Sequence, residues 1–396
     1  MKKELISMQR YLTVISAFFI MLCVGSVYAW SMISSELINN FDFSSVQSQL
    51  VFGTIIAIFP VTMIFAGKFE KLLGVRTLTL LSALFFSVGY IVSGLSDGNF
   101  YIILAGIGVF GGIGTGLGYF VSITTPAKWF TEKKGLVTGI TVAGFGLASF
   151  IFSMVIENLL ISGKSILDLF VIIGIVYGII ILFFSNFIKV PLTDKTVVIT
   201  KQTFKVDGKF IKLFFGIFFG TFAGLLIIGS LKLIGSVHNI SNHSLVIGVS
   251  VFAIANFSGR LFFGALSDYI GASICIFLAL LLQAVSIFFL GYLDLNSVTY
   301  IALSFLIGFG FGGNFVLFAK ETAQVFGIHD FGIIYPYVFL GYAIAGIFGP
   351  LTGGFLYDRF NNYDFASYTA SVMSLIGGLI FLVNYIVSKI TSNNKS

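Results

Sequence analysis

The chain has 396 residues, of which 57% are hydrophobic and 10% charged, and its mean hydropathy is +1.04. A soluble protein of this length needs far more polar surface to cover its core, so the composition excludes a soluble globular protein. The formal net charge of +6 would favour a nucleic acid as partner only if the basic residues clustered on one face, and their placement argues against this.

Twelve apolar runs follow one another along the chain, each near the roughly 20 residues that a helix needs to span a bilayer. They begin near residues 11, 48, 77, 100, 136 and 169, and then near residues 213, 244, 274, 299, 332 and 366. The longest polar stretch, residues 189–210, separates the sixth run from the seventh. The sequence therefore predicts an all-α membrane protein with twelve transmembrane helices in two pseudo-symmetric halves, residues 1–188 and 211–396. The first run is too long for the apolar region of a cleavable signal peptide.

Glycines repeat along the chain at a fixed offset of 197 residues. Gly67 and Gly264 form one pair, and the same offset links Gly74 with Gly271, Gly111 with Gly308, Gly116 with Gly313, Gly135 with Gly332, and Gly144 with Gly341. Because glycine accounts for only 45 of the 396 residues, six matches at one offset indicate two copies of one unit. Two parallel copies in so apolar a chain are typical of secondary transporters, whose substrate site lies between the copies near the bilayer midplane.

Lysine and arginine concentrate in alternate polar segments. If the N-terminus is inside, the outside segments carry only Lys164 and Arg359, while the linker 189–210 and the other inside segments carry most of the basic residues. By the positive-inside rule, both termini are expected in the cytoplasm of a multi-pass protein of the cell membrane, with the linker cytoplasmic as well. The positive charge then reflects topology, so we expect the lipid bilayer, and no nucleic acid, as partner.

The segment between the second and third runs resembles the signature loop of the major facilitator superfamily: it reads Gly67-Lys-Phe-Glu-Lys-Leu-Leu-Gly74-Val-Arg76. Its counterpart between the eighth and ninth runs, Gly264-Ala-Leu-Ser-Asp268-Tyr-Ile-Gly271, keeps the acidic position but lacks the terminal arginine. The first copy also departs from the pattern, because Glu70 comes one residue early and Lys71 stands where the acid is usual.

Further motifs, taken in order, are similar to the oxalate:formate antiporter family, a cousin of the monocarboxylate transporters. They are Gly25-Ser-Val-Tyr28-Ala-Trp30, Gly118-Tyr119, Lys128-Trp129-Phe130, Asn256-Phe-Ser-Gly-Arg260 and Gly312-Gly313-Asn314-Phe315. The resemblance covers essentially the whole chain. It implies the major facilitator fold and the transport of a small organic anion.

The acidic position of the signature loop has a physical role that needs no substrate. A carboxylate near a cytoplasmic helix end can pair with basic residues of the adjacent helix or loop, and such pairs hold the two halves closed on that side until the protein rocks. We expect Glu70, Lys71, Arg76 and Asp268 to act as this gate. The alternative is a solvated loop that only obeys the positive-inside rule; for Asp268, framed by two glycines, the gating role is favoured.

Arg260 is the leading candidate for the substrate site. If the eighth helix ends near Leu266, Arg260 lies about 9 Å inside that end. A guanidinium at such depth costs at least about 2.5 kcal/mol, so intramembrane charges usually face a cavity and carry function. Arginine stays protonated and offers a planar fork that fits a carboxylate. The alternatives are snorkelling toward the cytoplasm and pairing with backbone carbonyls.

A second cation is harder to assign. Lys232 lies near the outer end of the seventh helix, where it either snorkels or attracts anions in the outward-open state, and Lys320 is expected at the cytoplasmic interface. The oxalate carriers of the similar family are associated with a lysine in the eleventh helix, but here that helix has no basic residue before Arg359, and Pro336 is expected to kink it. A single arginine suits a monocarboxylate such as lactate, pyruvate or formate better than oxalate, unless Lys232 supplies the second charge.

Other polar and aromatic residues are expected to complete the pocket. Asn256 precedes Arg260 by one turn on the same face and is placed to orient its guanidinium. The remaining candidates offer hydroxyl, indole or amide groups to a small anion: Tyr28, Trp30, Tyr119, Asn314 and Tyr335. Most aromatic side chains of this chain, with its 48 Phe and 16 Tyr, are packing or interface residues.

The sequence holds no pattern typical of an enzyme. His238, His243 and His329 are too scattered for a metal site, no nucleophile, base and acid converge, and no phosphate-binding loop is present. We therefore predict a transporter without metal or cofactor that works as a monomer by alternating access. Antiport, uniport and proton-linked transport remain open, although the eighth helix carries no acid beside Arg260, which favours antiport or uniport. The alternative function is a membrane sensor or scaffold that keeps the transporter fold.

Overall fold

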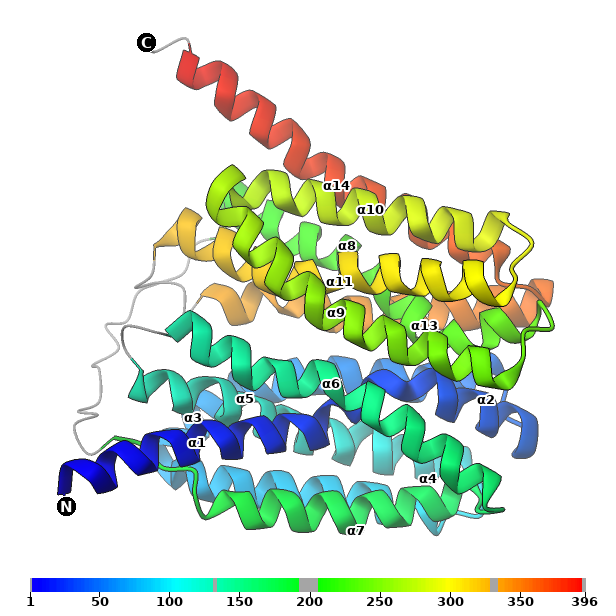
Figure 1. The fold of residues 1–396 in the computed structure, drawn as a ribbon, viewed down its shortest axis with the longest axis horizontal. Coiled ribbons are helices and arrows are strands. Elements are labelled where there is room, and N and C mark those ends of the chain that lie inside the picture. The colour runs from blue at the N-terminus through cyan, green and yellow to red at the C-terminus, as the bar shows by residue number, and fades with distance from the viewer. Residues whose placement is uncertain (1, 131–133, 192–205, 328–333, 394–396) are drawn as a thin grey trace. The chain divides into compact units, whose positions relative to one another are not determined.

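The computed structural model describes residues 2–130, 134–191, 206–327 and 334–393, and the regular elements in these ranges are helices (Figure 1). In this part of the chain, 12 helical segments are long and apolar enough to cross a membrane. The predicted all-α fold with twelve spans is therefore confirmed.

The first six spans are built from α1 (Lys2–Val24), a 3₁₀ stretch η1 (Gly25–Ala29), α2 (Trp30–Asn40), α3 (Ser45–Gly94), α4 (Phe100–Ile103), a π-helical stretch η2 (Leu104–Gly111), α5 (Gly112–Trp129), α6 (Lys134–Ile161) and α7 (Ile166–Ser185). The first span joins α1, η1 and α2, and the fourth joins α4, η2 and α5. The long α3 holds the second and third spans, which meet at a break at Gly74.

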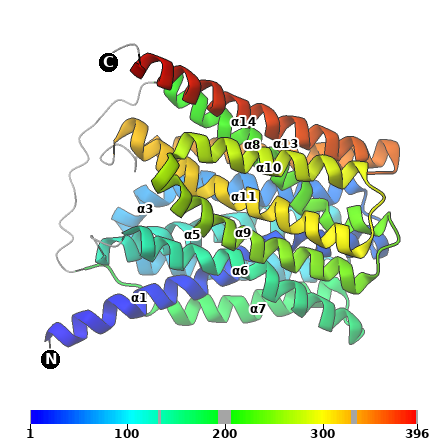
Figure 2. The same cartoon turned by 45° about the horizontal axis from the view of Figure 1, so that its top comes forward.

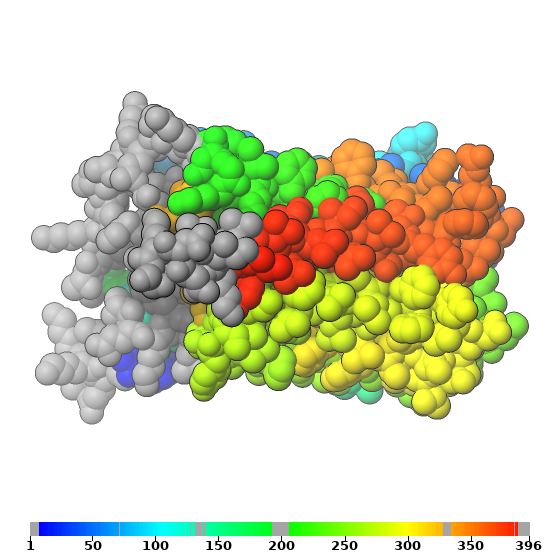
Figure 3. Space-filling model, turned by 90° about the horizontal axis from the view of Figure 1, so that it is seen from above, coloured from blue at the N-terminus to red at the C-terminus, as the bar shows by residue number. Residues whose placement is uncertain are grey.

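The second six spans are α8 (Gly208–Ser236), α9 (Asn242–Ile270), α10 (Ala272–Tyr292), α11 (Ser297–Phe326), α13 (Leu340–Phe360) and α14 (Asp364–Asn393), with a short helical stretch 334–338 before α13. In this set α9 lies along α11, and α10 lies between α11 and α14 (Figure 2). The red residues of α14 run beside the yellow-green residues of α10 on the face drawn in Figure 3.

The chain divides into two compact units. The first comprises residues 1–29 and 54–203, and the second comprises residues 30–53 and 204–396. The chain thus passes from one unit to the other at the end of η1 and again within α3, between Gly53 and Thr54. The division into halves 1–188 and 211–396 with a linker between them stays a prediction.

Equivalent glycines have equivalent structural roles in the two repeats. Gly144 in α6 packs on the backbone carbonyl of Phe18 in α1, and Gly341, just within α13, packs on the carbonyl of Phe214 in α8, so that a Cβ at either glycine would collide with backbone. The glycines of the two signature loops are matched in conformation as well: φ and ψ are 78° and 161° at Gly74, and 89° and 154° at Gly271. This region of backbone space is essentially restricted to glycine.

Several helix starts in the described chain carry side-chain caps. Ser165 and Asp168 form a reciprocal capping box at α7, and Asn296 and Thr299 form another at α11. Asp207 accepts the N–H of Phe210 at the start of α8. Such caps satisfy backbone donors that have no partner within the helix, and so they fix where each span begins.

Candidate functional site

Arg260 is buried in the middle of α9, with 7% of its surface exposed. Its Nε donates to Oδ1 of Asn256 at 3.0 Å, and its guanidinium carbon lies 4.8 Å from the ring centre of Phe315 in α11. The buried Nη1 has no hydrogen-bond partner, and no described carboxylate forms an ion pair with this guanidinium. The hydrogen bond expected from the spacing of Asn256 and Arg260 is therefore present, and one buried donor remains for a ligand.

An aromatic cluster extends from the guanidinium of Arg260. The ring of Phe315 lies 6.3 Å from that of Phe339 and 5.4 Å from that of Tyr342. Tyr335 joins the cluster through Phe339, at a ring separation of 5.5 Å. The eleventh span runs from Ile334 to Phe360, with Phe339 at φ −68° and ψ −13° between the stretch 334–338 and α13. The kink expected at Pro336 stays a prediction, because the turn before it lies outside the described residues.

Asn314 takes part in a hydrogen-bond network between helices. Its Nδ2 donates to Oε1 of Gln283 in α10 at 3.4 Å, and Nε2 of Gln283 donates to the carbonyl of Gly220 in α8 at 2.9 Å. Both amide side chains are buried. The contacts of Asn314 thus tie α8, α10 and α11 together beside the helix that carries Arg260.

Tyr28 and Tyr119 come together in the first unit, on either side of Phe145. The ring of Tyr28, in η1, meets Phe145 edge-on at 5.1 Å, and the ring of Tyr119, in α5, does so at 5.2 Å. Tyr119 also packs on Phe59 of α3, at 5.4 Å. The two motif tyrosines, far apart in sequence, therefore share one aromatic cluster.

Trp30, at the start of α2, belongs to the second unit. Its fully buried ring stacks on Phe52 with 6.2 Å between ring centres, and its Nε1 has no hydrogen-bond partner. A buried indole N–H without an acceptor is unusual, because buried polar groups are nearly always paired. Trp30 and Arg260 thus each hold an unused buried donor in the second unit.

Lys232 forms an ion pair with Glu36 of α2. Its Nζ lies 3.6 Å from Oε1 of Glu36, and the exposed fractions of the two side chains are 6% and 17%. The hydroxyl of Tyr300 donates to the carbonyl of Leu231, and the Tyr300 ring packs on Gly248, which places Lys232 near the level of Gly248. Arg260 lies further along α9, roughly 18 Å away along the helix axis at 1.5 Å per residue.

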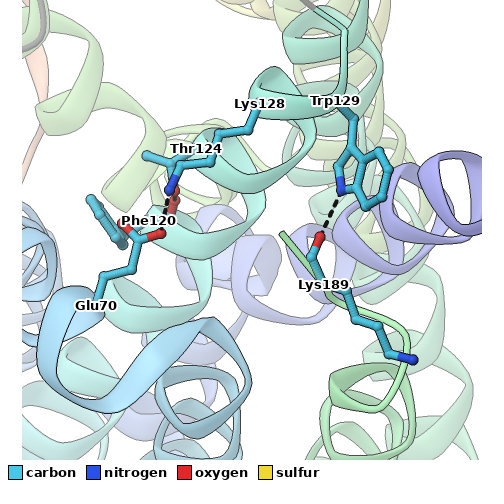
Figure 4. A network of polar contacts seen from close by, with 6 residues as sticks. All are labelled: Glu70, Phe120, Thr124, Lys128, Trp129 and Lys189. Atoms are coloured by element: carbon cyan, nitrogen blue, oxygen red, sulfur yellow. Dashed lines mark hydrogen bonds and ion pairs between the residues drawn. The ribbon is translucent and has the colours of Figure 1, made fainter. Parts of the chain in front are cut away.

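The acid of the first signature loop pairs within its own unit. Oε1 of Glu70 accepts a hydrogen bond from Nζ of Lys128 at 2.7 Å (Figure 4). Arg76 donates from Nη2 to Oδ1 of Asn186 at 2.7 Å. The side chain of Lys71 lies outside the described part of the structure. These contacts join the third and fourth spans to their neighbours in the first unit.

The acid of the second loop behaves in the same way. Lys320, at the end of α11, pairs with Asp268 and also donates to Oγ of Ser267 at 2.9 Å. In both repeats the loop acid therefore binds a lysine two spans further on. A gating role across the two halves stays a prediction, because each observed partner lies in the same unit as its acid.

The motif Lys128-Trp129-Phe130 anchors the chain where it leaves α7. Nε1 of Trp129 donates to the carbonyl of Lys189 at 2.6 Å (Figure 4), and the ring of Phe130 lies 5.9 Å from that of Tyr11. Gln9 of α1 donates to the neighbouring carbonyl of Phe187 at 2.7 Å. This family motif therefore fixes the beginning of the polar stretch that follows the sixth span.

Several residues at these sites were not singled out from the sequence. Glu36 had no signal, since a lone acid near a helix end usually faces water, and Gln283 sits in an apolar run without a motif. Phe315 was visible within its motif, but its place under the guanidinium of Arg260 depends on how α9 and α11 pack.

Comparison with known proteins agrees with this architecture. The family model of the Major Facilitator Superfamily matches residues 13–210 and 213–396. The chain is 28% identical over 349 residues to the uncharacterised MFS-type transporter YhjX of Escherichia coli (strain K12), covering 85% of this chain and 86% of the relative. It is 25% identical over 362 residues to the oxalate:formate antiporter of Oxalobacter formigenes, covering 89% and 86%.

A shorter match supports the wider relationship. The chain is 24% identical over 150 residues to monocarboxylate transporter 14 of Homo sapiens, covering 38% of this chain and 29% of that protein. These relatives point to a membrane transporter rather than an enzyme. With twelve apolar spans, repeated loops and a family match along nearly its whole length, the chain belongs to the Major Facilitator Superfamily.

Proposed function

We propose that the chain is a secondary transporter of small monocarboxylates, such as formate, lactate or pyruvate, which it moves by alternating access. Arg260 is the group that binds the carboxylate, and Asn256 and Phe315 hold its guanidinium in place. The observation that carries this proposal is the buried Nη1 of Arg260, which has no partner in the described structure. A guanidinium in an apolar bundle costs free energy unless an anion compensates it.

The charge of the site favours a monoanion over a dianion. Among the described residues of the second unit, Lys232 is the other buried cation, and it already pairs with Glu36. Binding oxalate in contact with Arg260 alone would leave its second carboxylate without a cation, and an unpaired buried charge is costly. A monocarboxylate leaves no such charge. Oxalate therefore ranks below formate and lactate as a substrate of this chain.

The remaining parts of the proposal concern placement and coupling. The distribution of lysine and arginine supports a protein of the cell membrane with both termini in the cytoplasm. The Asp268 end of the second unit then faces the cytoplasm, and the opposite end, which carries Lys232 and Asp358, faces outward. Antiport or uniport is favoured over proton-linked transport, because the described structure places no carboxylate beside Arg260 to carry a proton.

The test is flux through purified protein in liposomes. Counterflow of labelled formate or lactate is expected in wild type, and Arg260→Lys should reduce it at least about 100-fold, because lysine keeps the charge but loses the planar fork. Arg359→Lys is the matched control, since Arg359 also lies over an aromatic ring, at 5.8 Å from Phe360, but is exposed at the end of α13.

The results of these flux and binding measurements distinguish the proposed function from the alternatives. Counterflow that survives in Arg260→Lys would remove Arg260 from the binding site. Oxalate outcompeting formate in wild type would contradict the charge argument. Binding of a carboxylate without any flux, detected as a thermal shift that Arg260→Lys abolishes, would favour a sensor that has kept the transporter fold.

A further inference from the structure

Residues 30–53 form a helical hairpin that packs with the second half of the chain. This hairpin 30–53 consists of α2, a turn, and the first residues of α3, and it belongs to the second unit although the chain on both sides of it belongs to the first. Its two arms are tied together, since Oγ of Ser48 donates to Oγ of Ser34 at 2.8 Å and Nε2 of Gln49 donates to the same oxygen at 3.4 Å. The hairpin is therefore one structural piece.

Asp358 completes the cap of α3 from the far end of the chain. Ser44 and Gln47 satisfy each other's backbone N–H groups at the start of this helix, at 3.0 and 2.9 Å. The next free donors, the N–H groups of Ser45 and Val46, both bind the carboxylate of Asp358, each at 3.1 Å. An acid at a helix N-terminus also interacts favourably with the helix dipole. The last turn of α13 thus supplies the acceptor for the two N–H groups that Ser44 and Gln47 leave without one.

Three further contacts hold the hairpin to the rest of the second unit. Nε2 of Gln49 donates to the carbonyl of Gly229 in α8 at 2.9 Å, and Glu36 pairs with Lys232 at 3.6 Å. The hydroxyls of Ser45 and Tyr363 lie 3.4 Å apart, within hydrogen-bond distance. These three contacts are polar, so their groups can be solvated when they separate. The hairpin also buries apolar side chains, among them Trp30, Leu37 and Phe52.

Backbones also approach closely at this contact. A Cβ on Gly354 of α13 would lie 3.0 Å from the carbonyl of Ser45, and a Cβ on Gly53 would lie 2.6 Å from the carbonyl of Gly346. The hairpin and α13 therefore fit together without side chains between them at these two points. Sliding of α13 along the hairpin would bring these backbones into collision, so the contact can open by separation more easily than by sliding.

The structure provides hinges where the hairpin joins the first unit. The first span changes from α-helix to 3₁₀ over Gly25–Ala29, and the unit boundary follows at Trp30. A 3₁₀ stretch inside a longer helix often marks a hinge. In α3, Pro60 lies about two turns beyond the boundary at Gly53 and removes a backbone hydrogen bond from the helix interior.

We propose that Asp358 is a latch of the transport cycle: by capping α3 it holds the hairpin 30–53 against α13, and this latch opens in each turnover. The proposal rests on the chain being a transporter, but not on which anion it carries. It makes Asp358 and the hairpin contacts gating groups that never touch the substrate.

The first test asks whether transport needs the hairpin to separate. In a background with Cys23 and Cys275 replaced by serine, Ser45→Cys and Tyr363→Cys are bridged with a bifunctional methanethiosulfonate reagent that a reductant removes. Bridging should stop counterflow, and the reductant should restore it. The matched control is Ser34→Cys with Ser48→Cys, a pair inside the hairpin with oxygens 2.8 Å apart, where bridging should leave counterflow unchanged. Counterflow that continues in the bridged Ser45/Tyr363 pair would overturn the proposal.

The second test needs no substrate. Ser45 of the hairpin is buried against Tyr363, so in the cysteine-free background a maleimide should label Ser45→Cys only when the hairpin separates from the rest of the second unit. Asp358→Ala should speed this labelling about fivefold, the population change that corresponds to about 1 kcal/mol at a helix terminus. Asp358→Asn, which keeps one acceptor, should lie between. Asp294→Ala, an exposed acid between α10 and α11 at the same end of the unit, should match wild type.

The two tests fail separately from the proposed function. Faster labelling of the Asp358→Ala protein with no flux of any carboxylate would keep the latch and remove the substrate assignment. Equal labelling rates in Asp358→Ala and wild type, in samples that elute as folded protein, would show that Asp358 is an ordinary helix cap and would overturn the latch.

Discussion

Asn256 determines how Arg260 presents its charge. The hydrogen bond from Nε fixes the guanidinium plane, and the stacking on Phe315 covers one face of it. The buried Nη1 then faces a place where the described chain offers no acceptor. Because the side chain of Asn256 is a neutral amide, it orients the guanidinium of Arg260 without neutralising its charge. Arg260 therefore keeps its positive charge for an anionic ligand.

Replacing that amide by an acid should therefore block binding. Asn256→Asp would give Arg260 a buried carboxylate, and the resulting ion pair would compete with any anionic ligand. We expect the affinity for formate or lactate to fall about tenfold or more, as measured by thermal shift. Asn239→Asp is the control, since Asn239 is exposed at φ 57°, a conformation that aspartate also adopts. Unchanged affinity in Asn256→Asp would mean that ligands bind elsewhere.

The ion pair of Lys232 and Glu36 makes a second prediction at this scale. Because both side chains are largely buried, removing one charge takes a close counter-charge away from the other. Lys232→Met or Glu36→Gln alone should each destabilise the protein by about 3 kcal/mol, and the double variant should recover most of the loss. Unfolding in detergent measures all three, and additive losses would contradict a direct pair. Lys232→Met should not change the preference for formate over oxalate.

Close helix packing at the repeated glycines can be tested at the scale of elements. Gly341→Ala places a methyl group against the carbonyl of Phe214 and should cost about 1–3 kcal/mol. Gly67→Ala is the matched change within α3, where the nearest atoms belong to Phe120 at 3.7 Å, an ordinary contact. This control should be neutral or slightly stabilising, because alanine favours helix. Equal melting temperatures for the two variants would refute the packing role.

The helices and their repeat were predictable because their signals are local. Apolar length gives the spans, and the glycine offset gives the twofold duplication, which the matched packing of Gly144 and Gly341 now explains. The pairing of Asn256 with Arg260 was also predictable, since residues four apart on a helix share a face.

Contacts between segments far apart in the chain could not be predicted from the sequence. Glu36 meets Lys232, and the N–H groups of Ser45 and Val46 meet Asp358, across hundreds of residues with no pattern that joins them. Lys128 was part of a motif, but its partner Glu70 depends on how the fourth span packs beside the second. Charge and spacing identify residues that need partners, while tertiary packing decides which partners they receive.

At the scale of the whole molecule, topology links the proposed chemistry to the membrane. If both termini are cytoplasmic, the loop between α8 and α9 is outside and the loop between α9 and α10 is inside. A membrane-impermeant maleimide added to intact cells should label Asn239→Cys, while Tyr269→Cys, at a site that is 87% exposed, should react only after permeabilisation. The native Cys23 and Cys275 are buried and should not react with the maleimide. The reverse pattern would invert the orientation.

The π-helical stretch in the fourth span shows how the two copies have diverged. The fourth span, Phe100 to Trp129, and its counterpart α11, Ser297 to Phe326, start and end at the same offset of 197, yet only the former contains the π-helical Leu104–Gly111. The copies have thus kept their length and changed their winding. The side chains before Gly111 therefore point in other directions than those of the residues 197 positions later in α11. An alignment of the two halves by sequence alone would assign these directions wrongly.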